Sequence, residues 1–182
     1  QSCQPHLGCY VTKVAPKMPM ATTSEKMAGA KQMEQKMSNS PKPYVYVAGP
    51  LFDEGERWFI EKIDQLIQDA GFDTFLPHRD NPPKTAENVG EIFLNDKGGI
   101  DRCQVVVANL NGIMTDDGTA WEMGYAYAHD KYIIGLFTDW RARFPNGNEV
   151  VNLMMQCSIN KLVRSLDELD QSLRDWLTTQ QK

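Results

Sequence analysis

The stretch that decides the fold is Asp116-Asp117-Gly118-Thr119-Ala120-Trp121-Glu122-Met123-Gly124-Tyr125-Ala126, which follows the apolar run Val105-Val106-Val107-Ala108-Asn109-Leu110. The apolar run predicts a buried strand, and the stretch after it predicts a helix beginning near Gly118. Glu122 would lie in the first turns of that helix, where the helix dipole favours an ionised carboxylate. A partly desolvated carboxylate at the carboxyl edge of a parallel sheet suits a nucleophile. A surface glutamate that only complements the dipole fits the same position, and the spacing does not separate the two interpretations.

The rest of the chain alternates between strand-like and helix-like segments. We expect strands at residues 44–49, 72–76, 105–110, 132–137 and 161–163, and helices at 54–70, 86–101, 118–130, 150–155 and 166–177. This alternation predicts an α/β fold, an open five-stranded parallel sheet with helices on both faces. Ligands bind such sheets beyond the carboxyl ends of the strands. The loops expected at that edge are 49–53, 77–84, 110–119 and 138–148. Gly98-Gly99 inside a predicted helix indicates either a break or a close approach to a neighbouring element.

Residues 1–43 differ in composition from the rest of the chain. They are rich in Lys, Met, Gln, Ser and Pro, and Tyr10 is their only aromatic residue. We interpret them as a flexible N-terminal tail or leader, and residues 44–182 as one catalytic domain.

The overall composition excludes several classes of function. The 182 residues carry a formal net charge of -5, which argues against a nucleic-acid-binding surface. No run approaches the roughly 18 uninterrupted apolar residues of a membrane span. The four cysteines form no CxxC pair and have no histidine at metal-ligand spacing, so we expect no metal site and a reduced, intracellular setting. Neither a GxGxxG fingerprint nor a Walker loop is present, so we expect no cofactor.

The edge loops and their neighbourhood are rich in acids and aromatic side chains. Several carboxylates around an aromatic floor suit a sugar, because carboxylates bind hydroxyls and stabilise an oxocarbenium-like transition state. The residues in question are Tyr46, Phe52, Asp53, Asp80, Asp96, Asp116, Asp117 and Glu122.

Four segments together resemble the nucleoside 2-deoxyribosyltransferases: residues 46–52, Asn95-Asp96, the Asp116–Ala126 run and Asn152-Leu153-Met154. The resemblance covers residues 44 to about 178 and implies a flavodoxin-like fold and exchange of the base on a 2'-deoxynucleoside. It implies that Glu122 is the nucleophile that attacks C1' with net retention by ping-pong kinetics, and that Tyr46 orients it by a hydrogen bond. Asp96 would transfer a proton to or from the base.

The same resemblance implies further roles at the substrate. Asp116 would bind deoxyribose hydroxyls, and a neighbouring subunit would supply Asn152 and Met154 to the site. It therefore implies a dimer-based homo-oligomer, such as a hexamer, that works in cytoplasmic nucleotide salvage. The remaining candidates for the substrate pocket are Gly49, Phe52, Arg79 and Asp80.

Each of these residues also has a purely structural interpretation. Tyr46 and Phe52 suit core packing, Asp96 suits a solvated helix face, and Asn152 and Met154 suit an ordinary short helix. Asp116 and Asp117 could merely cap a helix, and Asp117 is the residue we expect at the N-cap.

Two other functions stay open from the sequence. Arg141 and Arg143, in a loop that departs from the simplest family members, suit a 5'-phosphate. These two arginines leave open a second function, that of a 2'-deoxynucleoside 5'-monophosphate N-glycosidase, which would use Glu122 with water as acceptor. A non-catalytic nucleotide-binding module on the same fold is the third alternative.

Overall fold

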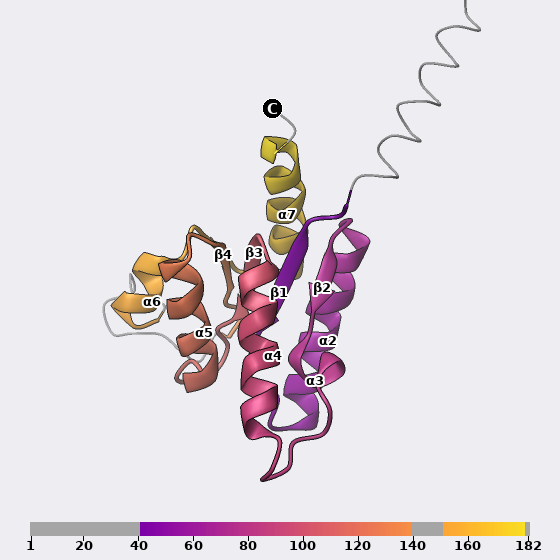
Figure 1. Ribbon diagram of the computed structural model, residues 1–182. Coiled ribbons are helices and arrows are strands. Elements are labelled where there is room, and N and C mark those ends of the chain that lie inside the picture. Colours follow the sequence, from indigo (N-terminus) through magenta and orange to yellow (C-terminus); the bar gives the residue numbers. More distant parts are fainter. Residues whose placement is uncertain (1–40, 140–150, 181–182) are drawn as a thin grey trace, which may run out of the picture. The chain divides into compact units, whose positions relative to one another are not determined.

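The computed structural model describes residues 41–139 and 151–180, in which helices and strands alternate (Figure 1). The strands are all parallel and lie in the order β2-β1-β3-β4-β5, the order of flavodoxin-like sheets. The predicted open five-stranded α/β fold is therefore confirmed. In chain order the elements are β1 (Tyr44–Ala48), α2 (Glu54–Asp69), β2 (Asp73–Phe75), α3 (Pro77–Asp80), α4 (Val89–Arg102), β3 (Val105–Asn109), α5 (Asp117–Ala128), β4 (Tyr132–Leu136), α6 (Leu153–Ser158), β5 (Lys161–Val163) and α7 (Leu166–Gln180).

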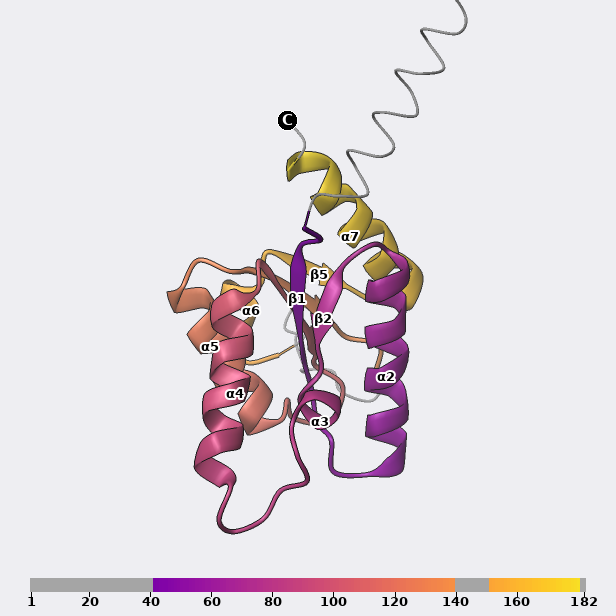
Figure 2. The same cartoon turned by 45° about the vertical axis from the view of Figure 1, so that its right-hand side comes forward.

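The alternation of side chains along each strand divides the core into two layers. In β3, Val105 and Val107 pack with the apolar faces of α2 and α7, whereas Val106 and Ala108 pack with residues of α4 and α5. Figure 2 shows α2 and α4 on opposite sides of β1 and β2. Every residue of β3 is buried, because both faces of the central strand are covered.

Two aspartates begin the helices that follow β1 and β3. Asp53 accepts a hydrogen bond from the backbone N–H of Glu56 at 2.8 Å and forms a capping box at the start of α2. At α5 the N-cap is Asp116 and not Asp117, so our prediction was one residue too late. The reason is geometric: Asp116 has the non-helical backbone of a cap, and its carboxylate reaches the N–H of Thr119 three residues on.

The other differences from prediction are short or terminal. The expected polar loop after β2 contains the one-turn helix α3, which has Pro77 at its start. Helix α4 begins at Val89 because Thr85 donates its backbone N–H to Asn88 Oδ1 in a preceding turn. Helix α6 begins at Leu153, after Asn152 as N-cap. Helix α4 is continuous through Gly98-Gly99, so the pair marks no break, and Gly99 alone makes a close approach to a neighbouring element.

Some expectations fall on residues outside the described ranges. The predicted tail lies there apart from its last residues, as do Arg141 and Arg143. Within residues 41–139 and 151–180, no helix is long and apolar enough to cross a membrane.

Candidate active site

Tyr46 and Glu122 meet where β1 and β3 lie side by side and the connections leave toward opposite faces of the sheet. Tyr46 is fully buried in the middle of β1, and Glu122 lies in the second turn of α5. The Tyr46 hydroxyl donates a hydrogen bond to Glu122 Oε1 at 2.5 Å. This point of the strand order is where ligands bind open α/β sheets. The hydrogen bond that the resemblance implied is thus present, and the orienting role of Tyr46 stays a prediction.

Glu122 lies in an environment that disfavours its charge. Burial raises the pKa of Glu122 to about 8, and the nearby Asp96 and Asp116 carboxylates add to that increase. The hydrogen bond from Tyr46 acts in the opposite direction because it stabilises the carboxylate. Burial and the Glu122 charge also raise the pKa of Tyr46, so this hydroxyl keeps its proton and remains a donor.

Asp96 lies on α4, and its charge acts on the same pair. Burial raises its pKa, while the side chain of Asn81 donates a hydrogen bond to Asp96 Oδ1 at 2.6 Å and lowers it. The Asp96 charge raises the pKa of both Tyr46 and Glu122, which shows that it lies within electrostatic range of both. Sequence reasoning missed Asn81. Its position in the loop after β2, at the carboxyl edge, was the available signal.

Asp116 joins the site from the start of α5. Its Oδ2 accepts hydrogen bonds from the Thr119 backbone N–H at 2.8 Å and from the Thr119 hydroxyl at 3.0 Å. The structural interpretation of Asp116 as a cap is thus correct, and its charge nevertheless reaches Glu122. A role in binding sugar hydroxyls stays a prediction.

Arg79 and Asp80 are tied into a separate ion-pair cluster. Arg79 contacts Asp80 and the buried Asp64, each at 2.7 Å, and donates to the Thr74 carbonyl at 2.9 Å. Asp80 also accepts the Leu76 backbone N–H at 2.8 Å. These bonds brace β2 and α3 against α2. They explain both residues without a substrate, and their place in the substrate pocket stays a prediction.

Gly49 and Phe52 follow β1 at the edge of the sheet. A Cβ atom at Gly49 would lie 2.6 Å from Ile60 Cδ1 and 3.0 Å from Asn109 Cβ, so glycine permits the close packing of β1 against α2 and β3. Phe52 is 79% exposed, which makes core packing the wrong interpretation for it. Contact of either residue with a substrate stays a prediction.

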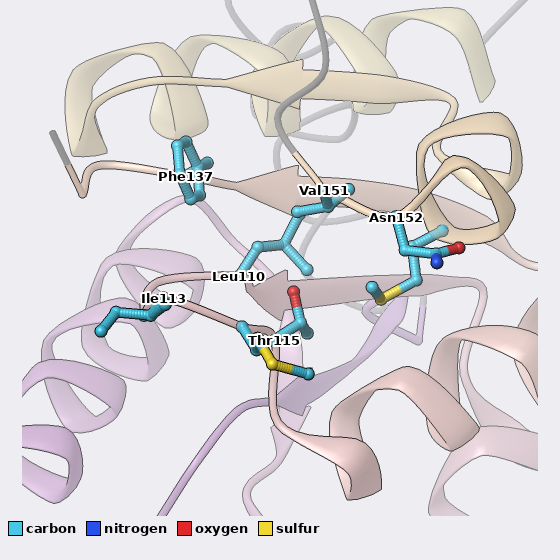
Figure 3. A pocket seen from close by; sticks show the side chains of 9 residues that line it. Leu110, Ile113, Thr115, Phe137, Val151 and Asn152 are labelled. Atoms are coloured by element: carbon cyan, nitrogen blue, oxygen red, sulfur yellow. The ribbon is translucent and has the colours of Figure 1, made fainter. Parts of the chain in front are cut away.

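A cavity of about 270 Å³ lies beyond the ends of β3 and β4 (Figure 3). Its lining is mostly apolar, with two polar exceptions. Thr115 Oγ1 is buried without a hydrogen-bond partner among the described residues, and Asn152 Oδ1 accepts the Met154 backbone N–H at 2.9 Å. Met154 itself is 75% exposed. The lining residues are Leu110, Gly112, Ile113, Met114, Thr115, Phe137, Val151, Asn152 and Met155.

Residues 45–154 match the family model for nucleoside 2-deoxyribosyltransferase, which is more than half of the chain. The chain belongs to this family. The matched range includes Tyr46, Asp96 and Glu122, the three residues that the geometry gathers. An uncharacterised protein of Ureaplasma parvum serovar 3 is 33% identical over 131 residues, which are 62% of this chain and 80% of that protein.

Several solved structures have a fold similar to that of this chain. A conserved protein from Enterococcus faecalis V583 has a TM-score of 0.64 and 24% identity, over 74% of this chain and 98% of that one. A 2-deoxyribosyltransferase from Bacillus psychrosaccharolyticus has a TM-score of 0.59 and 23% identity, over 70% and 90%. A 2-desoxiribosyltransferase from Leishmania mexicana has a TM-score of 0.55 and 22% identity, over 73% and 97%.

Among the described residues, no group of three or more His, Cys, Asp or Glu side chains could hold a metal ion. The groups that the site does offer are a hydroxyl, two carboxyls with raised pKa values and the carboxylate that caps α5. Such a set can supply a nucleophile and a proton donor.

Proposed function

We propose that this enzyme exchanges the nucleobase of 2'-deoxyribonucleosides through a covalent 2-deoxyribosyl ester on Glu122. The observation that carries the proposal is the 2.5 Å hydrogen bond from Tyr46 to Glu122, with the Asp96 charge acting on both. A carboxylate held in one orientation by a buried donor is a competent nucleophile. Deoxyribose suits it, since a sugar without a 2'-hydroxyl forms an oxocarbenium-like state more readily.

The chemistry proceeds in two displacements at one carbon. A Glu122 oxygen forms a bond to C1' while the bond from C1' to the base nitrogen breaks, and the base leaves with that electron pair. Protonated Asp96 gives its proton to the departing base. A second base then attacks C1', returns a proton to Asp96 and releases the Glu122 carboxylate. Two inversions give net retention, and the order of release gives ping-pong kinetics.

The protonation states of the two acids are linked. Ionised Asp96 raises the pKa of Glu122, so protonation of Asp96 makes ionisation of Glu122 easier. The reactive form, with Asp96 protonated and Glu122 ionised, is therefore favoured over a form with both charges. The Tyr46 hydroxyl stabilises the Glu122 carboxylate within that form.

A free nucleoside is a better substrate for the described part of the site than a 5'-monophosphate. A phosphate dianion needs cationic donors, and two arginines near this edge of the sheet are engaged elsewhere. Arg57 donates to the Leu51 carbonyl at 2.8 Å, and Arg79 is paired with Asp64 and Asp80. Arg141 and Arg143, which favour the monophosphate N-glycosidase, lie outside the described residues.

We also propose that the active form is a homo-oligomer in which a neighbouring subunit supplies Asn152 and Met154. The exposure of Met154, with Leu153 beside it 64% exposed, supports this proposal because large apolar side chains are seldom left so accessible. Exchange measured over a concentration series, beside light scattering, would test it. Activity that does not fall on dissociation to monomers would contradict it.

The test of the exchange reaction pairs a deoxynucleoside donor with a free second base and follows both products by chromatography. Adenine, guanine, hypoxanthine, cytosine and thymine serve in turn as donor and acceptor bases. A slow 2'-fluorinated deoxynucleoside should leave an adduct on the peptide that carries Glu122, visible by mass spectrometry. Turnover with an unmodified peptide would refute the ester. Hydrolysis of the 5'-monophosphate alone would favour the N-glycosidase.

A further inference from the structure

Gly99 of α4 is packed directly against the ring that orients the nucleophile. A Cβ atom at Gly99 would lie 2.9 Å from two ring atoms of Phe75 and 3.0 Å from Cδ2 of Tyr46. Real Cβ atoms do not come so close to ring carbons, so only a glycine lets the α4 backbone touch these rings. Gly99 is buried, and its contact is with side chains anchored in the sheet.

The two rings form a rigid surface. Tyr46 and Phe75 are opposite residues of the paired strands β1 and β2, and their rings stack with centroids 5.5 Å apart and an interplanar angle of 11°. The far end of Tyr46 is held by its hydrogen bond to Glu122. A side chain at position 99 would therefore displace α4 more readily than it would displace both rings.

The same helix carries the proton-transfer residue. Asp96 is three residues before Gly99, which places both on one face of α4. The contact at Gly99 thus fixes how close the Asp96 side chain comes to the Tyr46–Glu122 pair. Asn81 holds the other side of Asp96 through its 2.6 Å hydrogen bond.

We propose that Gly99 is a positioning residue, which sets the distance between Asp96 and the reacting base by allowing α4 to contact Tyr46 and Phe75. This inference rests on the proposed base exchange, in which Asp96 protonates the departing base. A displacement of about 1 Å in a catalytic group lowers rates by about 100-fold. A methyl group at position 99 should therefore impair the proton transfer and leave the nucleophile in place.

The chain offers a matched control in Gly98. A Cβ atom at Gly98 would meet only the Arg102 Nη1 atom at 3.5 Å, an ordinary contact with the end of a flexible side chain. Gly98→Ala and Gly99→Ala therefore make the same change in helix propensity at adjacent positions of one helix. They differ in the contact with Tyr46 and Phe75.

The experiment compares two donors in the wild type, Gly98→Ala, Gly99→Ala and Asp96→Asn. One donor is 2'-deoxyadenosine, whose base must be protonated as it leaves. The other is 7-methyl-2'-deoxyguanosine, whose cationic base leaves without protonation. We expect Gly99→Ala to lower kcat for deoxyadenosine by about 30- to 100-fold, with less than a threefold change for the cationic donor. Asp96→Asn should show the same pattern, and Gly98→Ala should match the wild type with both donors.

Several outcomes would overturn the inference. Equal kinetics of Gly99→Ala and Gly98→Ala would remove the positioning role, and equal losses with both donors would assign Gly99 to packing alone. Rates are expressed per active site that forms the fluorinated adduct, which excludes misfolded protein. The double variant Gly99→Ala/Phe75→Ala removes the two Phe75 atoms, Cγ and Cδ1, that the methyl group would meet, and it should recover at least tenfold of the lost deoxyadenosine activity over Gly99→Ala. A wild type without exchange on either donor would instead refute the proposed function.

Discussion

Two groups of partly buried acids lie near the carboxyl edge of the sheet, and they differ in whether an arginine neutralises them. In the paired cluster, Arg79 lies between Asp64 and Asp80 at 2.7 Å from each. In the unpaired cluster, Asp96 and Glu122 share the neighbourhood of Tyr46, and no described ion pair includes either acid. Burial raises the pKa of Asp80, but the hydrogen bonds from Arg79 and the Leu76 backbone, together with the Arg79 charge, bring it below its ordinary value. Burial instead raises the pKa of Asp96 and Glu122 above theirs.

This difference in pairing and in pKa separates acids that stabilise the fold from acids that can take part in a reaction. A carboxylate neutralised by arginine stays ionised and braces the fold, but it is a poor base and a poor proton donor. An acid that burial keeps near its titration point can gain and lose a proton during a reaction. Composition alone does not distinguish them, since both clusters consist of acids close to strand ends.

The largest expected effect is on Glu122→Gln, which keeps the shape of the side chain and removes the nucleophile. Exchange should fall by at least about 1,000-fold, as for other covalent nucleophiles. The folded state of the variant should, in contrast, be more stable than that of the wild type at high pH. Since the folded pKa of Glu122 is raised to about 8, the wild type loses stability as the pH rises from the ordinary value of 4.5 toward 8. The variant lacks that loss.

Thermal unfolding of both proteins between pH 5 and 9, beside exchange assays, checks this prediction. The variant should be equal to the wild type at pH 5 and more stable at pH 9. A variant that is less stable at high pH would show that the Glu122 carboxylate stabilises the fold, as the acids of the paired cluster do.

Tyr46→Phe should shift the pH dependence of the reaction. Because the nucleophile must be ionised, kcat/KM of the wild type for 7-methyl-2'-deoxyguanosine, a donor that needs no proton from Asp96, should rise with pH, reach half of its maximum near pH 8 and level off above it. Loss of the hydrogen bond that lowers the pKa of Glu122 should move this rise to higher pH by about one unit. Phe75→Leu is the control, because it alters the packing of the Tyr46 ring without removing the donor. An unmoved profile in Tyr46→Phe would show that Tyr46 only packs.

The sheet and its helices follow from local patterns, and for that reason they could be predicted. A run of apolar residues predicts β3, and the polar, glycine-containing turn that follows predicts the start of α5, each to within a few residues. Helix α3 escaped prediction because one turn of four residues has no hydrophobic period. The choice of Asp116 over Asp117 as cap depends on a backbone angle that adjacent aspartates do not reveal.

The contacts within the site, in contrast, do not follow from local sequence patterns. Glu122 and Tyr46 are 76 residues apart, and their pairing was expected only from the family resemblance. The partner of Arg79 is Asp64, on an earlier helix, and their contact depends on how α2 packs against β2. Tertiary packing of this kind leaves no local periodicity in the sequence. It also decides which acids are neutralised, and so which of them are available for chemistry.

Asp64→Ala should damage the fold and spare the chemistry. The substitution leaves Arg79 and Gln68 without the carboxylate that both contact at 2.7 Å. We expect a loss of about 2 kcal/mol in the free energy of unfolding, below the range for fully buried pairs because Arg79 is partly exposed. Exchange per folded molecule should stay within about threefold. Denaturant unfolding and the exchange assay measure the two quantities.

Asp170→Ala is the control for that experiment. It removes an exposed ion pair with Arg174 one helical turn away in α7 and should leave the unfolding midpoint unchanged. An Asp64→Ala variant of normal stability but greatly reduced exchange would move Asp64 and Arg79 from the paired cluster into the catalytic machinery.

Asp80→Asn should have the smallest effect, and its pH dependence should be the reverse of that at Glu122. Arg79 holds the pKa of Asp80 below its ordinary value of 3.8, so the charge stabilises the folded state above that pH and the stabilisation is lost as the pH falls. Asparagine still accepts the Leu76 backbone N–H with its side-chain oxygen. The variant should therefore be less stable by about 1 kcal/mol at pH 7, and the difference should shrink as the pH falls from 5 to 3. Denaturant unfolding of both proteins at pH 3, 5 and 7 measures it. A difference that grows toward acidic pH would place Asp80 with the unpaired acids.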